Sequence, residues 1–224
     1  MNRRDCLVNL GLASAWSHTA LAAGLTESDA AGGIRVALQR GALSAVSLLG
    51  RTDGFLGNPK VRIPLPGHLE EAANVLRKFG QGRRVDELVT SMNRAAERAV
   101  PEAKALLVQA AKDISVEDAL RIVRGGDTSV TDYFAGKTRA PLGERFLPIV
   151  TRATERVALA DKYNAVAERA SRFGLVRPED ANLQQHVTAK ALDGLYLMIG
   201  EEERKIRRDP VATGSAILRK VFGG

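Results

Sequence analysis

Apolar residues recur every three to four positions along most of this chain, and that spacing predicts α-helices rather than strands. One face of the first such stretch carries Ile34, Leu38, Val46 and Leu49. After residue 67 the periodicity resumes and hardly stops. The predicted helices span residues 26–50, 67–79, 84–99, 101–112, 115–124, 128–137, 141–159, 160–173, 181–207 and 213–222.

Glycine and proline residues support these limits. Gly80 and Gly125 stand where a helix C-terminus favours glycine, whereas Pro101 and Pro141 suit first helical turns. Pro148 lies inside a periodic stretch. Because proline removes a backbone donor, this position predicts a kink or an early end of the helix.

The segment 51–67 interrupts the helical pattern, because it is rich in glycine and proline and its apolar residues Val61, Ile63 and Leu65 alternate with other types. We expect an ordered extended loop, or a small hairpin that turns at Gly57-Asn58-Pro59. Its apolar side chains carry more surface than a solvated loop requires. The loop should therefore dock on the helices.

Composition supports a helical core of ordinary size. The 224 residues are 45% apolar and 26% charged but only 4% aromatic, and alanines are frequent between residues 95 and 111. Small side chains allow helices to approach closely, and few aromatic residues argue against a sheet core. The predicted fold class is all-α, a single multi-helix bundle with one ordered loop or small hairpin near residues 51–67.

The first residues are typical of an export signal rather than of that domain. Arg3 and Arg4 precede a modest apolar stretch, and Ala20-Leu21-Ala22 provides small residues for cleavage. We predict a signal peptide over residues 1–22, of either the Sec or the twin-arginine type, and a mature helical domain over 23–224 in the periplasm. Cleavage would lower the formal net charge from +7 to +6, since two arginines and an aspartate are lost.

No later stretch reaches the roughly 18 apolar residues that a membrane-spanning helix needs, so we expect a soluble mature chain without a transmembrane segment. The arginine-rich composition of the full chain and its pI near 9.8 favour an anionic partner. Export argues against nucleic acid. Phospholipid headgroups, acidic envelope polymers or a small ligand are the partners that such a protein would meet.

Several ordered motifs resemble a known bacterial family. They are Asp53-Gly54-Phe55-Leu56-Gly57-Asn58, Val61-Arg62-Ile63-Pro64-Leu65-Pro66, Met92-Asn93-Arg94-Ala95-Ala96-Glu97 and Ala191-Leu192-Asp193-Gly194-Leu195. From about Leu25 to Gly223 the chain is similar to domain of unknown function 4197. The resemblance implies a helical protein exported to the cell envelope, and it brings no catalytic residue with it.

Motifs for nucleotide or metal chemistry are incomplete. Gly136-Lys137-Thr138 lacks the upstream glycine of a phosphate-binding loop, where this chain has Thr131, and it follows a helical segment rather than a strand. After cleavage the chain holds two histidines, His68 and His186, and no cysteine. Both histidines fit surface positions. We therefore predict no metal site and no cofactor.

Asn93 and Glu97 are the most informative polar residues. They lie one turn apart at the edge of an apolar helical stripe. Such a pair suits hydrogen bonds to the backbone of the neighbouring loop, but a ligand site or acid-base catalysis would use the same residue types. Because the loop would form one wall of any site, Asp53, Phe55 and Asn58 join them as candidate ligand-binding residues.

Asp193 is a charge within the segment 187–199, which is apolar around most of its circumference and should be the central helix of the bundle. We predict a buried carboxylate paired with Lys190 or with an arginine elsewhere, since an unpaired buried charge is costly. A functional carboxylate is the alternative.

These observations favour a non-enzymatic periplasmic protein that binds a ligand or an envelope partner near the loop, Asn93 and Glu97. One alternative is a hydrolase-like enzyme that uses Glu97, Asp193 or a clustered glutamate, with an arginine to stabilise charge. A structural component of the envelope is the other.

Overall fold

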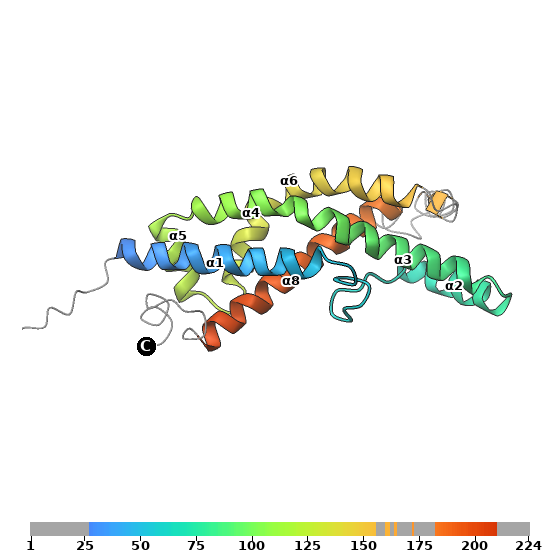
Figure 1. Cartoon of the computed structure of the whole chain (residues 1–224), viewed down its shortest axis with the longest axis horizontal. Helices are drawn as coiled ribbons and strands as arrows, with labels where there is room; N and C mark the ends of the chain where they lie inside the picture. The colour runs from blue at the N-terminus through green and yellow to red at the C-terminus, as the bar shows by residue number, and fades with distance from the viewer. Residues whose placement is uncertain (1–26, 156–159, 162–163, 165–171, 173–181, 210–224) are drawn as a thin grey trace, which may run out of the picture.

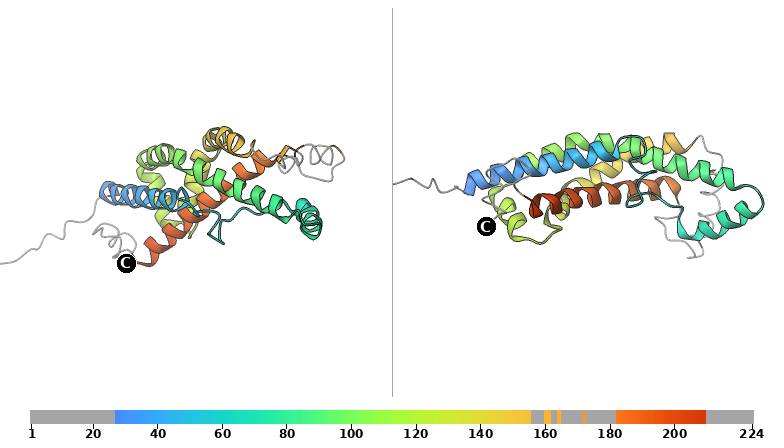
Figure 2. Two further views of the ribbon diagram at one scale, coloured as in Figure 1. Left: turned by 45° about the vertical axis from the view of Figure 1, so that its right-hand side comes forward. Right: turned by 60° about the horizontal axis from the view of Figure 1, so that its bottom comes forward.

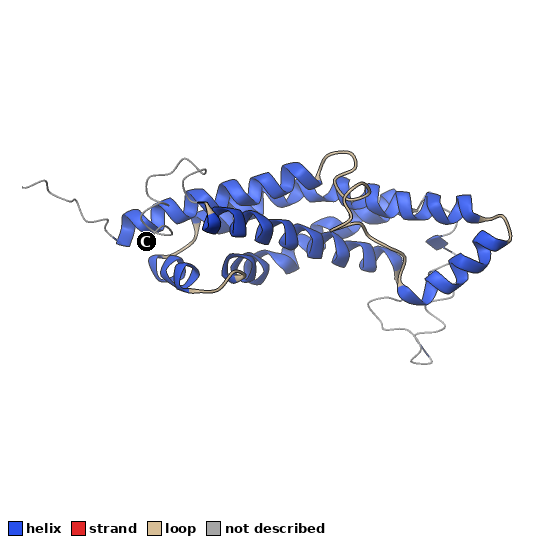
Figure 3. Ribbon diagram, turned by 90° about the horizontal axis from the view of Figure 1, so that it is seen from below, coloured by secondary structure: helices blue, strands red, loops and turns tan. Residues whose placement is uncertain are grey.

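The computed structural model describes residues 27–155, 160, 161, 164, 172 and 182–209, and within them the chain forms an elongated bundle of helices (Figure 1). No strand occurs in this described part, so the all-α prediction is confirmed (Figure 3). The elements are α1 (Glu27–Leu49), α2 (Gly67–Lys78), α3 (Gly82–Ala99), the 3-10 turn η1 (Val100–Glu102), α4 (Ala103–Lys112), α5 (Val116–Arg124), α6 (Ser129–Thr154) and α8 (Leu183–Arg208).

Three sequence predictions fall on residues outside these ranges. They are the signal peptide over 1–22, most of the helix predicted at 160–173, and the helix predicted at 213–222. Among the described helices, none combines the length and apolar character needed to cross a bilayer.

Helix α8 is the central element of the bundle. It packs against α1, α3 and α6, and Figure 2 shows it crossing the other helices obliquely. Its buried side chains occur on almost all sides and include Val187, Ala191, Leu195 and Ile199. The predicted central helix is thus confirmed, and its burial follows from its nearly continuous apolar circumference.

Helix α6 corrects the prediction of a break between residues 137 and 141, and of the two alternatives predicted at Pro148 it excludes an early end of the helix. The helix runs unbroken from Ser129 to Thr154 with both prolines inside it. A proline in a helix interior costs about 3 kcal/mol. This cost is outweighed by a buried stripe that repeats every four residues, namely Val130, Phe134, Thr138, Leu142, Phe146, Val150 and Thr154.

The loop between α1 and α2 is ordered by successive turns rather than by a hairpin ladder. Gly57 N–H donates to the Asp53 carbonyl, and the N–H groups of Val61 and Arg62 both donate to the Asn58 carbonyl. The hairpin alternative is therefore wrong, because these local bonds occupy the groups that a strand partner would need. The docked loop is confirmed, since its apolar side chains Phe55, Val61, Ile63 and Leu65 are all buried.

Asp193 corrects the prediction of a buried carboxylate. Its side chain is 48% exposed, yet it is paired as expected, with Arg139 Nη2 at 2.5 Å from Oδ1 and Lys190 Nζ at 3.6 Å from Oδ2. The residue lies on a narrow exposed stripe of α8 that also carries Gln185, Ala189 and Leu197. An exposed ion pair contributes about 1 kcal/mol or less, so this aspartate does not hold the core together.

Its neighbour Gly194 contributes more to the packing of the bundle, because its backbone faces the loop. A Cβ placed on Gly194 would lie 2.8 Å from Phe55 Cε1 and 3.2 Å from Val61 Cβ. Both loop residues are buried. The loop thus rests on the bare backbone of the central helix, and only glycine leaves room for that contact.

Gly194→Ala should therefore lower the free energy of unfolding by about 1 to 3 kcal/mol, because the added methyl group displaces Phe55 or Val61. Gly136→Ala is the matched control on α6, where an added Cβ meets nothing within 4 Å. It should raise stability by up to about 1 kcal/mol through helix propensity. Denaturant unfolding of both variants tests this prediction. If both variants gained the same free energy of unfolding, the loop would not rest on Gly194.

Candidate functional site

Asn93 joins α3 to the loop through a pair of buried hydrogen bonds. Its side chain is fully buried, although α3 otherwise buries mainly apolar residues. Asn93 Oδ1 accepts from Ile63 N–H at 2.8 Å, and Nδ2 donates to the Ile63 carbonyl at 2.9 Å and to the Val89 carbonyl at 2.8 Å. The side-chain amide of Asn93 thus forms the two hydrogen bonds that a neighbouring strand would otherwise form with the backbone of Ile63.

Glu97, one turn further along α3, binds the other half of the loop. Its Oε1 accepts from the backbone N–H groups of Phe55 and Leu56, each at 3.1 Å. Its Oε2 accepts from Arg94 Nη1 at 2.7 Å. The side chain is only 4% exposed. Both oxygens are therefore hydrogen-bonded, which offsets the cost of burying this polar side chain.

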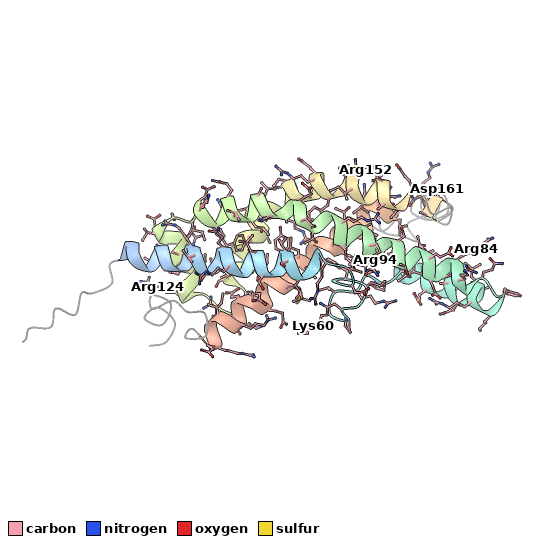
Figure 4. All side chains as sticks on the ribbon, viewed as in Figure 1. Lys60, Arg84, Arg94, Arg124, Arg152 and Asp161 are labelled. Atoms are coloured by element: carbon pink, nitrogen blue, oxygen red, sulfur yellow. The ribbon has the colours of Figure 1, made fainter. Side chains whose placement is uncertain are left out.

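Arg94 extends the network to the edge of the loop, where Figure 4 labels it. Its Nη2 donates to Asp53 Oδ1 at 2.8 Å. The pKa of Arg94 is raised above its ordinary value, mainly by the hydrogen bond to Glu97. Burial acts in the opposite direction but has a smaller effect, and the hydrogen bond to Asp53 raises the pKa further. The guanidinium is therefore permanently charged. Asp53 has a positive φ of 64°, a conformation that aspartate tolerates better than most residues.

The structure brings four of the five predicted ligand-binding residues to the contact between α3 and the loop: Asp53, Phe55, Asn93 and Glu97. Phe55 contributes its backbone N–H and a fully buried ring. The interpretation of Asn93 and Glu97 as tethers of the loop is confirmed by their hydrogen bonds. Direct contact of a ligand with either side chain would require the loop to leave.

Asn58 has a different role, within the turn of the loop. Its Oδ1 accepts from Lys60 N–H at 3.2 Å, and its own N–H donates to the Phe55 carbonyl at 3.1 Å. Lys60 then pairs with Glu201 of α8 at 3.2 Å. The hydrogen bond to Arg204 and then the one to Lys60 lower the pKa of Glu201. Asn58 thus shapes the turn that brings the loop to α8.

Where the loop leaves α1, a groove of about 470 Å³ opens beside it. Apolar side chains of α1 and Pro101 of η1 form much of the lining, and Arg51 and Lys104 bring two positive charges to it. Both cations are exposed, and neither is ion-paired with a carboxylate of the described residues. The full lining is Leu43, Val46, Ser47, Gly50, Arg51, Pro101 and Lys104.

Neither this groove nor the role of Arg94 was predicted from the sequence. The proximity of α1 to η1 and α4 is a tertiary contact that no local pattern reveals. Arg94 had a usable signal, because it stands three residues before Glu97 within the motif of residues 92–97.

A second depression, of about 700 Å³, runs along the exposed side of α3 toward α6. It carries both signs of charge, including Arg83, Arg98, Asp86 and Glu87, and Arg83 lies 3.6 Å from Glu87. Arg94 lines it as well, and two of its three arginines, Arg83 and Arg94, are already paired with carboxylates.

Residues 24–223 match the family DUF4197, whose description is a protein of unknown function. The chain belongs to this family. No curated protein and no solved structure matches it. In this DUF4197 member, the motifs of residues 53–58, 61–66 and 92–97 are the segments that build the loop and its tethers.

The described part of this DUF4197 chain has no group of three histidine, cysteine, aspartate or glutamate side chains placed to hold a metal ion. His186 corrects the expectation of a surface position, because it is buried in α8. The central place of α8 in the bundle explains the difference.

Glu97→Ala should free the loop, because it removes the acceptor of two buried N–H groups and leaves Arg94 without its closest partner. We expect the free energy of unfolding to fall by about 2 to 4 kcal/mol. Trypsin should then cut at Lys60 and Arg62 in otherwise folded protein. Glu87→Ala removes an exposed carboxylate from the same helix and should change stability by less than about 0.5 kcal/mol. A loop that stays resistant in Glu97→Ala would contradict the tether.

Proposed function

We propose that this protein is a non-enzymatic binding protein of the periplasm and that its ligand is an anionic amphiphile of the cell envelope. The observation that supports this most is the groove at the start of the loop. It combines an apolar lining with two cations, Arg51 and Lys104, that have no carboxylate partner among the described residues. An acyl chain would lie on the lining, and its carboxylate or phosphate would meet the cations.

The dimensions and chemistry of the groove suit such a ligand. Its volume of about 470 Å³ lies within the range of small-molecule sites. A guanidinium forms bidentate hydrogen bonds with a carboxylate or phosphate, and an ammonium adds a second positive charge. The partly exposed Leu43 of α1 and the exposed Pro101 of η1 offer apolar surface for the chain of the ligand.

The tethered loop supports binding through preorganisation. Arg51 is the second residue after α1, and the segment that follows is fixed to α3 by Glu97. The close contact of Gly54 with the last carbonyls of α1 holds the start of the loop as well, since a Cβ at Gly54 would lie 2.3 Å from the Leu49 oxygen. A site whose backbone is already ordered loses less entropy when it binds.

The hydrolase alternative has less support, because Glu97 and Asp193, the two carboxylates that it names by position, serve other contacts. Glu97 directs its oxygens to the loop and to Arg94, and it is nearly inaccessible. Asp193 is exposed but paired with Arg139. A general acid or base must reach the proton that it transfers, and Glu97 does not reach solvent.

The test uses protein recovered from the periplasm after expression of the full chain, with its mass showing whether the chain starts at Ala23. Calorimetry compares a long-chain fatty acid with the uncharged alcohol of equal length. We expect the acid to bind and the alcohol to bind at least about tenfold more weakly, because the alcohol lacks the charge-assisted hydrogen bonds.

The double variant Arg51→Ala, Lys104→Ala should lose roughly ten- to hundredfold in affinity for the acid. The matched control is Lys112→Ala, Lys137→Ala, which removes two exposed cations elsewhere on the bundle. Equal affinity for acid and alcohol, or equal losses in the two double variants, would refute the proposal.

A further inference from the structure

The hairpin formed by α2 and α3 projects from the bundle and carries an unusual tip. Helix α2 packs mainly against α3, and Figures 1 and 2 show the turn between them at the far end of the molecule. We define the hairpin tip as residues 75–84.

An aromatic ring lies bare at this tip. Phe79 is 78% exposed, the largest value for a large apolar residue in the described part of the chain. Val75, one helical turn earlier, is 51% exposed. Single exposed apolar residues are common on protein surfaces, but a neighbouring pair at the end of a projecting element marks a contact site.

The backbone that carries Phe79 is closed by hydrogen bonds rather than frayed. Gly80 adopts a φ of 74°, and the hydrogen bonds from Gly80 N–H to the Arg77 carbonyl and from Gln81 N–H to the Leu76 carbonyl close the helix end. This pattern is the Schellman motif. It fixes the direction in which the backbone presents Phe79.

Four cations flank Phe79 in the sequence, with no carboxylate among them. They lie within the eight residues Arg77-Lys78-Phe79-Gly80-Gln81-Gly82-Arg83-Arg84. Arg77 and Arg83 have acidic partners in Glu70 and Glu87, whereas Lys78 and Arg84 are exposed and have no ion pair within the described residues. Figure 4 labels Arg84 near the free end of the hairpin.

We propose that the hairpin tip docks on an anionic phospholipid bilayer, with Phe79 inserted at the headgroup level and the four cations among the lipid phosphates. Aromatic rings favour the interfacial region, and basic residues beside them are attracted to anionic lipids. An apolar protein partner would cover Phe79 but would give the surrounding positive charge no role. The hairpin tip shares no residue with the groove, and its docking on lipid does not depend on the proposed ligand.

The experiment uses protein recovered from the periplasm and vesicles of phosphatidylglycerol mixed with phosphatidylcholine, with pure phosphatidylcholine vesicles for comparison. In cosedimentation we expect binding to the anionic vesicles only, weakened by added salt. Phe79→Glu and the pair Lys78→Glu, Arg84→Glu should each lower the partition coefficient by at least roughly tenfold. Leu197→Glu, an exposed apolar position on α8, should leave binding unchanged.

Phe79→Trp tests insertion directly, because Trp16 is the only tryptophan of the chain and precedes the predicted cleavage site. Its emission should shift to shorter wavelength with anionic vesicles, while that of Leu197→Trp should not shift. Circular dichroism checks that each variant folds.

Three results would overturn the proposal. One is equal binding to neutral vesicles. Another is unshifted emission of Phe79→Trp on bound vesicles. The third is a dimer that forms without lipid and disappears in Phe79→Glu, which would make the hairpin tip a contact between protein copies.

Discussion

The architecture of this protein depends on how an irregular loop satisfies its backbone. A chain segment without a ladder partner must hydrogen-bond to something if it is to be buried. Here two side chains on one turn of α3 supply those bonds, Asn93 to Ile63 and Glu97 to Phe55 and Leu56. The apolar side chains of the loop can then enter the core.

This arrangement connects three helices through the loop. Helix α3 provides the polar tethers, while α8 provides bare backbone at Gly194 and, through Glu201, a partner for Lys60. The loop begins directly after the end of α1, so the end of this helix determines where Arg51 lies. Removal of the tethers should therefore affect both the stability of the bundle and the shape of the groove beside Arg51.

Much of this could be predicted from sequence because the determining patterns are local. Helical periodicity located the helices and the central place of α8, and the position of Asn93 and Glu97 at a stripe edge pointed to the loop. Predictions failed where tertiary packing outweighs local preference. The prolines of α6 are tolerated because of a buried stripe, and Asp193 lies on an exposed stripe that hydrophobicity alone does not reveal.

The groove could not be predicted at all, because Arg51 and Lys104 meet only through the packing of α1 against α4. No spacing in the sequence encodes that contact. The family assignment does not help either, since DUF4197 is defined without a function. The functional proposal therefore rests on exposed charge and apolar surface rather than on a motif.

Hydrogen exchange at single amides is the most direct measure of whether Asn93 and Glu97 hold the loop. We expect the N–H groups of Phe55, Leu56 and Ile63 to exchange as slowly as those in the middle of α8, because they should become exposed only when most of the protein unfolds. Exposed amides of the same loop, such as that of Lys60, should exchange much faster. If Phe55, Leu56 and Ile63 exchanged at the rate of Lys60 while α8 stayed protected, the loop would open independently of the bundle and the account would be wrong.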